Sequence, residues 1–280
     1  MRPRHYIKNG LLLLPIVFSG RLLEAALLWR AAAGFLSFCF LSSFIYILND
    51  IRDAAHDRLH PTKCNRPIAS RAVSVRSAWI LAAVVLILSC AFNIFAAGGN
   101  ISGWVFWLLY LIINIAYSMW LKHVAIVDVA LLASGFLLRV LYGASITEIE
   151  ISRWLYLTVI SAAFYLGLGK RRNELSGSGE QSRKVLARYN LSFLDKNMYL
   201  CMALAIVFYS LWSVDAITIA RVGSTNLIWT VPLVLLICLK YSLIVENSSD
   251  GDPVEVLFSD WVLCLLVVVF AAVMLGIVYL

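Results

Sequence analysis

Three aspartates at regular spacing are the clearest chemical feature of this 280-residue sequence. Asp50, Asp53 and Asp57 stand at intervals of three and four residues, directly after a long apolar run. If a helix continues from that run, this spacing places the three carboxylates on one face. Because like charges on one face repel each other, a hard divalent cation such as Mg²⁺, which prefers oxygen ligands and often bridges to phosphate, would stabilise them. The spacing therefore predicts a metal site with Asp50, Asp53 and Asp57 as its ligands.

Amide and basic side chains accompany the aspartates in the same segment. They are Asn49, Arg58, Lys63 and Arg66. Carboxylates beside cations suit a metal-bound diphosphate, because the acids hold the metal while Arg and Lys neutralise the remaining phosphate charge. The alternative is a solvated charged loop, but the helical phase of the aspartates favours the diphosphate site.

A second group of charges begins at residue 170. Lys170, Arg171 and Arg172 follow an apolar run, and Glu174 is the only acid close to them. Cations at the end of a membrane helix are common for reasons of dipole and topology alone. The functional interpretation is a second anion site, for a phosphate that carries no metal.

Charged residues inside apolar segments are costly and are functional by default. Arg139 lies within the apolar run 133–144, and Asp128 lies near the beginning of the same segment. The two residues are about three helical turns apart, so we expect Arg139 to face a central cavity instead of pairing with Asp128. Lys8 lies in a basic N-terminal stretch, where it serves either as an interfacial anchor or as a side chain that reaches the site.

The composition excludes a soluble globular enzyme and a disordered chain. Hydrophobic residues make up 62% of the sequence, charged residues only 14%, and the mean hydropathy is +0.87, so too few charges remain for a polar surface. The six cysteines form no CxxC pair and no cluster with histidine, so the sequence indicates neither disulfides nor zinc. We predict an all-α polytopic membrane protein in which residues 1–280 form one intramembrane domain. Nine apolar segments are expected to span the membrane, at 9–23, 27–48, 72–95, 101–121, 124–144, 154–168, 198–215, 226–245 and 258–280.

The distribution of positive charge predicts the orientation. If the N-terminus is inside, most of the 23 Lys and Arg residues fall in inside segments, and the outside segments contain only Arg21, Arg30, Arg153 and Arg221. The positive-inside rule therefore favours an N-in, C-out arrangement. The long polar loops 49–71 and 169–197 and the acidic loop 246–255 then face the cytoplasm, which places the chemistry at the cytoplasmic side of the inner (plasma) membrane. The net charge of +7 is explained by this topology and not by a nucleic-acid partner.

These motifs resemble the UbiA superfamily of intramembrane prenyltransferases. The chain is similar, in particular, to the branch that includes decaprenyl-phosphate phosphoribosyltransferases. The resemblance is carried by the segments RPRHYIKN, NDIRDAAHDRLHPTKCNRPIAS, AYSMWLKHVAIVDVALLASGFLLRVLYGA, GLGKRRNEL and GDPVEVLFSDW, which extend from residue 2 to residue 261. It implies nine helices around a central cavity, Mg²⁺ as cofactor, and substrate-binding roles for Tyr117 and Lys122 in addition to the residues named above.

One departure from the aromatic prenyltransferases of this superfamily is informative. Those enzymes have a second aspartate-rich motif after the sixth helix, where this sequence has KRRNEL. One acid and three cations suit a free phosphate better than a second metal. The resemblance therefore implies transfer of 5-phosphoribose from phosphoribosyl diphosphate (PRPP) to a polyprenyl phosphate, in supply of cell-wall sugar.

Three matters stay open at the level of sequence. A UbiA-type transfer of a prenyl group from a prenyl diphosphate to an aromatic acceptor is the alternative reaction. An anion transporter fits less well, because no internal repeat is visible and the charges gather at one face. The sequence leaves homo-oligomerisation undecided, because lipid-facing and partner-facing helix surfaces look alike.

Overall fold

The computed structural model describes residues 3–59, 63–177, 184–247 and 252–280, and these residues form helices and loops without a strand. Residues 60–62, 178–183 and 248–251 of the three polar loops lie outside the described residues. The elements in chain order are η1 (Pro3–Leu13), α1 (Leu14–Phe18), α2 (Ala25–Asp57), η2 (Lys63–Asn65), α3 (Val75–Ala97), α4 (Ile101–Met119), η3 (Leu121–His123), α5 (Val127–Thr147), α6 (Arg153–Gly177), η4 (Lys184–Arg188), α7 (Leu191–Val214), α8 (Ala216–Val222), η5 (Asn226–Thr230), α9 (Val231–Asn247), α10 (Pro253–Ser259) and α11 (Trp261–Tyr279).

The all-α, multi-pass prediction is confirmed. Seven helical segments of the described chain are long and apolar enough to cross a membrane: α2, α3, α4, α5, α7, η5 with α9, and α11. The two shortest predicted spans differ from these. The first one, 9–23, overlaps a shorter apolar helix over His5–Phe18, and the sixth, 154–168, forms part of α6, a 25-residue helix whose C-terminal turns are charged. Nine spans and the N-in orientation therefore remain predictions.

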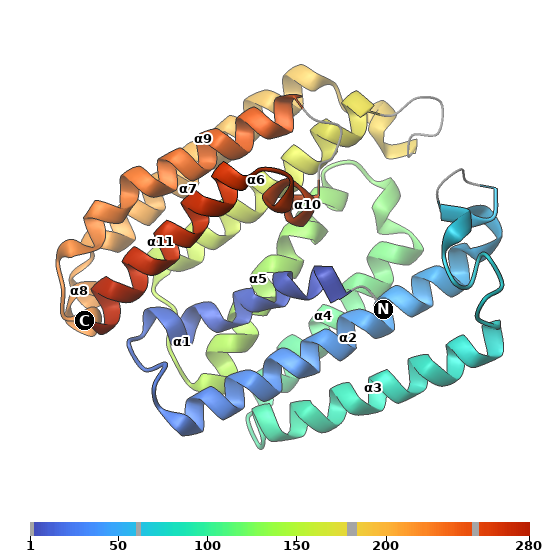
Figure 1. The fold of residues 1–280 in the computed structure, drawn as a ribbon, viewed down its shortest axis with the longest axis horizontal. Coiled ribbons are helices and arrows are strands. Elements are labelled where there is room, and N and C mark those ends of the chain that lie inside the picture. Colours follow the sequence, from blue (N-terminus) through green and yellow to red (C-terminus); the bar gives the residue numbers. More distant parts are fainter. Residues whose placement is uncertain (1–2, 60–62, 178–183, 248–251) are drawn as a thin grey trace.

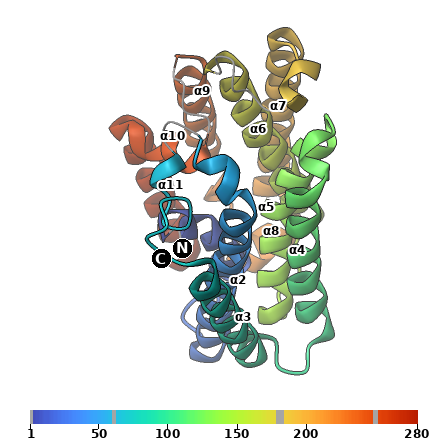
Figure 2. The same ribbon diagram turned by 90° about the vertical axis from the view of Figure 1, so that its right-hand side faces the viewer.

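The helices pack side by side, and their connections gather at two ends (Figures 1 and 2). We call the end that holds the C-terminal turns of α2, α4, α6 and α9 the aspartate end, and the other end the opposite end. Helix α2 has 33 residues, which corresponds to about 50 Å at 1.5 Å per residue. A bilayer core is about 30 Å thick, so α2 is long enough to extend its aspartates beyond the apolar layer.

Two apolar clusters form most of the interior. One joins α2, α4 and α5 with η1, through residues such as Phe38, Tyr110 and Tyr142. The other joins α6, α7 and α9, through residues such as Tyr165, Met198 and Val245. Figure 1 shows α5 between the α2–α3 pair and the α7, α9 and α11 group. Apolar packing therefore holds helices on both sides of α5.

The N-terminal helix η1 lies directly on α5. Gly143 makes this close approach possible, because a Cβ at that position would collide with the carbonyl oxygen of Leu12. At the opposite end, the Tyr279 hydroxyl donates to the carbonyl oxygen of Val17 (2.9 Å) and accepts from the backbone N–H of Leu22 (3.1 Å). The first apolar helix is therefore attached both to the centre of the bundle and to α11.

Candidate active site

The final turns of α2 present the predicted metal ligands to a hollow of about 570 Å³ at the aspartate end. The neighbouring face of the same turns is apolar. Ile47, Ile51 and Ala54, at helical spacing, pack with Ile68 and with α3. This packing fixes the rotation of α2, so the polar face with the aspartates turns toward the hollow.

The hollow brings together eight of the residues predicted from sequence. They are Asn49, Asp50, Asp53 and Asp57 on α2, Lys63 and Arg66 after it, and Tyr117 and Lys122 at the end of α4 and in η3. Its remaining lining residues are Tyr46, Arg52, His56, Ser118 and His123. Residues from segments far apart in sequence thus converge on one polar cavity.

Arg66 occupies the centre of the aspartate cluster. Its Nη1 atom lies 2.7 Å from Oδ2 of Asp57 and 3.3 Å from Oδ1 of Asp50. Two of the three carboxylates therefore already share one cationic nitrogen. Arg66 therefore differs from a freely solvated surface arginine, because one of the carboxylates that it binds, Asp57, is only 5% exposed.

The donor set of this cluster fits a divalent cation. In the described part of the chain, no three His, Cys, Asp or Glu side chains stand together as a ready metal site. However, Asp50 and Asp57 converge on one positive group, and Asp53 and the Asn49 amide add further oxygen donors to the same wall. Hard cations such as Mg²⁺ prefer such oxygens, and a metal here would take over the place of the Arg66 guanidinium.

The facing wall, formed by α4, α5 and α6, carries a buried ion-pair network. Arg171 donates to Asp128 through Nε (2.5 Å), to Glu174 through Nη1 (2.5 Å) and to the Tyr117 hydroxyl through Nη2 (2.9 Å). The side chains of Arg171 and Asp128 are fully buried. Arg171 therefore positions Tyr117, which also lines the aspartate hollow, and does not itself lie open to a ligand.

Tyr189 completes this network from the segment before α7. Its hydroxyl donates to Asp128 (2.6 Å) and accepts from the backbone N–H of Ile126 (2.5 Å). Burial and then the bond to Asp128 raise the pKa of Tyr189 to about 12, so the hydroxyl stays a donor. Ile126 has a φ of 69°, a conformation that is unusual for a β-branched residue and is found at constrained sites. The bond from Tyr189 holds this strained turn in place.

Lys8 and Lys170 meet on the η1 side of the site. Both contact Oδ2 of Asp252, at 2.8 Å and 3.3 Å. One turn earlier in η1, Tyr6 is hydrogen-bonded to Ser43 of α2 (2.6 Å). Of the two interpretations of Lys8, the structure therefore favours the one in which its side chain reaches toward the interior.

Arg139 and Arg58, which the sequence predicted to bind ligand, do not line the aspartate hollow. Arg139 is 8% exposed, and its guanidinium donates to Asn9 Oδ1 (2.8 Å), to the Gly135 carbonyl (2.7 Å) and to the Tyr110 hydroxyl (2.6 Å). It faces the interior, as expected, but its bonds hold η1 against α4 and α5. Arg58 donates to the carbonyl oxygen of Ala69 (3.2 Å) and is not among the residues that line the hollow.

Sequence reasoning missed several residues of this region. Asp252 was not predicted as a site residue, although it lies in the segment GDPVEVLFSDW and an aspartate before a proline is typical of a helix N-cap. It does cap α10, since its Oδ1 accepts from the backbone N–H of Val254 (3.1 Å). Tyr46, His123 and Tyr189 carried no signal, because their roles depend on neighbours from distant segments.

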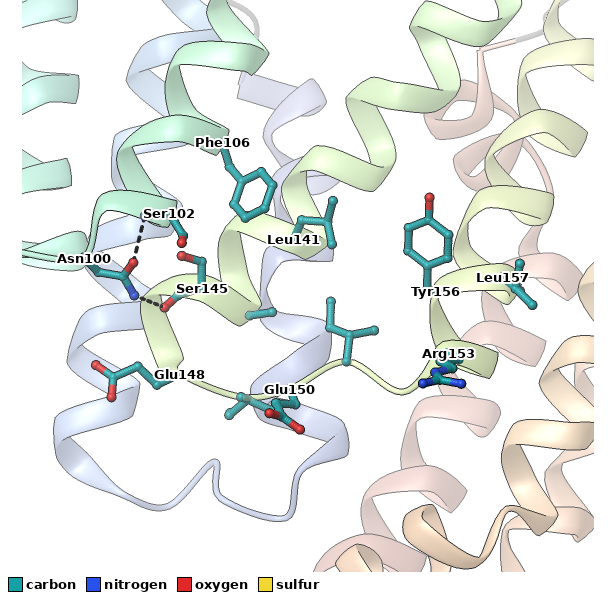
Figure 3. A pocket seen from close by; sticks show the side chains of 13 residues that line it. Asn100, Ser102, Phe106, Leu141, Ser145, Glu148, Glu150, Arg153, Tyr156 and Leu157 are labelled. Atoms are coloured by element: carbon teal, nitrogen blue, oxygen red, sulfur yellow. Dashed lines mark hydrogen bonds between the residues drawn. The ribbon is translucent and has the colours of Figure 1, made fainter.

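A hollow of about 750 Å³ at the opposite end is larger, but fewer charged side chains line it. Figure 3 shows Phe106, Leu141 and Tyr156 around the gap between α4, α5 and α6, while Glu148, Glu150 and Arg153 lie near the connecting loop. Glu148 is paired with Arg30 at 2.8 Å. Charged groups converge at the aspartate end and not here, so volume alone does not identify the site.

Comparison with known proteins agrees with the fold. A model of the UbiA prenyltransferase family matches residues 12–263. The decaprenyl-phosphate phosphoribosyltransferase of Corynebacterium glutamicum is 31% identical, over 96% of this chain and 85% of that protein. The protein of that name from Mycolicibacterium smegmatis is also 31% identical, over 95% of this chain and 87% of its own length.

A solved structure shows the same arrangement of helices. The UbiA homolog from Archaeoglobus fulgidus, bound to GPP and Mg²⁺, superposes with a TM-score of 0.73 at 22% identity, and the match covers 99% of this chain and 97% of that one. The helices that carry the aspartates here therefore belong to a shared architecture. On the family match, the full-length relatives and this common fold, the chain belongs to the UbiA prenyltransferase family.

Proposed function

We propose that this protein transfers the 5-phosphoribosyl group of PRPP to a polyprenyl phosphate and releases diphosphate. One observation carries the proposal: three carboxylates line the hollow from the α2 wall, and the acids of the facing wall are held by a buried arginine. At the position where a second metal would need them, Asp128 and Glu174 are both bound to Arg171. The site thus suits one metal-bound diphosphate and one phosphate without metal. The relatives named for this reaction, at 31% identity over nearly the whole chain, support it.

The reaction replaces one C–O bond by another. The bond between C1 of the ribose and the diphosphate oxygen breaks, and the electron pair leaves with the diphosphate. An oxygen of the lipid phosphate forms the new bond to C1. Because a phosphate is already an anionic nucleophile, the site needs no general base, and its contribution is positioning and charge stabilisation.

The residues of the α2 wall would hold the donor. Asp50, Asp53 and Asp57 would bind Mg²⁺, which supplies charge neutralisation to the departing diphosphate. Lys63, Lys122 and Arg66 line the same hollow. Arg66, released from the carboxylates when the metal binds, would move to the diphosphate, which is a better partner because its oxygens accept paired N–H bonds.

The facing wall would hold and orient the acceptor. Lys170 is the most exposed cation of the KRR segment, at 23% of its side chain, against 13% for Arg172 and 0% for Arg171. Arg171 and Arg139 act through their neighbours, since their guanidinium groups are already bonded to protein. The polyprenyl chain would leave the site between helices, whose outer faces carry large exposed apolar residues such as Ile87 and Phe95.

The topology belongs to the same proposal. With the N-terminus inside, the aspartate end faces the cytoplasm, where PRPP is available, and the protein is a multi-pass component of the inner (plasma) membrane. The charge distribution supports this orientation, because the basic residues concentrate at the aspartate end. Reaction of a single engineered cysteine near Arg66 with an impermeant reagent in intact cells would contradict it.

A transfer assay tests the proposal directly. Purified protein receives Mg²⁺, PRPP labelled in the ribose, and a short polyprenyl phosphate, and the label is followed into the organic phase. We expect a lipid-extractable product that requires all three components. No label from PRPP, together with transfer from a prenyl diphosphate to an aromatic acid, would instead support the prenyltransferase reaction that is the alternative within this family.

A further inference from the structure

Two lysines converge on one carboxylate where η1, α6 and the turn before α10 meet. Lys8 and Lys170 contact the same atom, Oδ2 of Asp252, while Oδ1 of Asp252 is used by the Val254 backbone. Helix α10 packs beside η1 at this position (Figure 1). One carboxylate thus serves two ammonium groups.

The cluster has an excess of positive charge in a partly desolvated place. The side chains of Lys8, Lys170 and Asp252 are only 15%, 23% and 16% exposed, and the positive charge of Arg139 also acts on Lys8. Burial and then Lys170 lower the pKa of Lys8 to about 8. Although burial opposes the change, Lys170 and Lys8 hold the pKa of the Asp252 carboxyl below its usual range. An anion with more charge than a carboxylate would balance these cations better.

A buried hydroxyl without a partner lies beside the same cluster. Tyr241 of α9 is 5% exposed, and its Oη atom has no hydrogen-bond partner among the described residues. Its ring packs against Tyr165 and next to Gly169, the neighbour of Lys170, and it interacts electrostatically with Asp252. Buried polar groups are nearly always bonded, so an orphaned donor close to Asp252, the carboxylate that the two lysines share, points to a missing acceptor.

The cluster is connected to the aspartate hollow through η1. The ring of His5 lies 5.8 Å from that of Tyr46, which lines the hollow. His5 and Lys8 are three residues apart in the 3₁₀ helix η1, and side chains at that spacing lie above one another. Lys8 therefore lies one turn from a residue that touches the wall of the donor site.

We propose that Lys8, Lys170 and Tyr241 form a second phosphate site, which takes a terminal phosphate monoester and which Asp252 occupies until that phosphate arrives. A phosphate monoester has three acceptor oxygens and nearly two negative charges at neutral pH, so it can accept from both lysines and from the tyrosine at once. Only the identity of the ligand rests on the proposed function: it is the acceptor's lipid phosphate or the 5-phosphate of the donor.

Binding of inorganic phosphate to the full-length protein tests the site without any turnover. The measurement uses calorimetry in detergent with EDTA, so that the metal site stays empty. We expect Lys8→Gln and Lys170→Gln to weaken binding at least about tenfold, the loss of one charge-assisted hydrogen bond. Asp252→Asn should tighten binding, because asparagine still caps α10 but no longer competes for the lysines.

The controls separate this site from a structural role. Glu255→Gln removes an exposed carboxylate one turn further along α10 and should leave the affinity unchanged, and Lys8→Arg should keep it. Tyr241→Phe should weaken binding without lowering thermal stability. Weaker or unchanged binding by Asp252→Asn, or wild-type binding by both lysine variants, would overturn the proposal.

Kinetics with the two substrates identify the ligand. If Lys8→Gln raises KM for the polyprenyl phosphate alone, the site holds the acceptor, whereas a rise for PRPP alone assigns it to the 5-phosphate. Unchanged KM values for both would overturn the proposal even if inorganic phosphate binds. If phosphate binds as expected but the wild type transfers nothing from PRPP, the second phosphate site stands and the proposed function fails.

Discussion

The two walls of the candidate active site differ in how completely their charged side chains are paired within the protein. On the α2 wall, Asp50 and Asp57 share a single arginine, and Asp53 has no ion pair within the described residues. On the α5–α6 wall, both oxygens of Asp128 are bonded, and Arg171 has three separate acceptors. The α2 wall can therefore accept a ligand without breaking the protein's own structure. The α5–α6 wall has its charges already paired within the protein, and its bond from Arg171 to Tyr117 holds that tyrosine at the edge of the hollow.

The α2 wall should lose activity and keep stability when a carboxylate is removed. We expect Asp53→Asn to lower phosphoribosyl transfer at least about 1,000-fold, as for other losses of a group that stabilises charge in the transition state. The melting temperature should not fall, because Asp53 makes no ion pair in the described structure. Transfer assays and thermal unfolding in detergent measure both effects. Glu150→Gln, a carboxylate change at the opposite end, is the matched control, and full activity of Asp53→Asn would refute the metal role.

The α5–α6 wall should lose stability first. Arg171→Leu leaves the fully buried Asp128 without its cation, which we expect to cost about 3–5 kcal/mol. The double variant Arg171→Leu/Asp128→Leu should recover part of that loss, because no unpaired buried charge remains. Thermal unfolding of the single and double variants provides the comparison. Equal stability of Arg171→Leu and the wild type would mean that this wall is not structural.

Lys8 should make phosphate binding dependent on pH. Its pKa of about 8 means that Lys8 is charged below pH 8 and becomes neutral above it, while Lys170 and Lys8 hold the pKa of the neighbouring Asp252 carboxyl below its usual range, although burial opposes this. We expect the affinity for phosphate to fall up to about tenfold between pH 7 and pH 9, the loss of one charge-assisted bond. Calorimetry across this range measures the effect. Because inorganic phosphate itself gains negative charge over this range, Lys8→Arg, whose guanidinium stays charged, provides the reference profile against which the fall is measured. The same profile in both proteins would assign the pH dependence to another group.

The hollow at the opposite end should respond least. Tyr156→Phe removes a hydroxyl from the gap shown in Figure 3, and we expect kcat/KM to stay within about two-fold of the wild type, the usual range for changes away from critical contacts. Steady-state assays with both substrates are sufficient. A tenfold loss would show that this hollow belongs to the substrate path and would remove the distinction between the two ends.

The sequence predicted local features well and long-range pairs poorly. The aspartate face follows from helical spacing, and seven predicted spans follow from apolar length, because both signals lie within one segment. Arg139 and Arg171 looked like ligand-binding cations because their partners, Asn9 and Asp128, are 130 and 43 residues away. The same limit applies to Asp252, whose capping role is local but whose partner Lys8 is 244 residues distant. Tertiary packing decides which charged side chains pair with other groups of the protein. The pattern of residues along the sequence does not contain that information.

The attachment of Tyr279 to Val17 and Leu22 has a consequence for biosynthesis. These contacts join the first apolar helix to α11, which is made after every other helix of the bundle. During translation, the N-terminal segment can pack on α5 before the hydrogen bonds from Tyr279 of α11 can form. The first apolar helix therefore gains these contacts only after α11 has been made. A nascent chain without α11 would lack this attachment, so the N-terminal segment reaches its final packing late in synthesis.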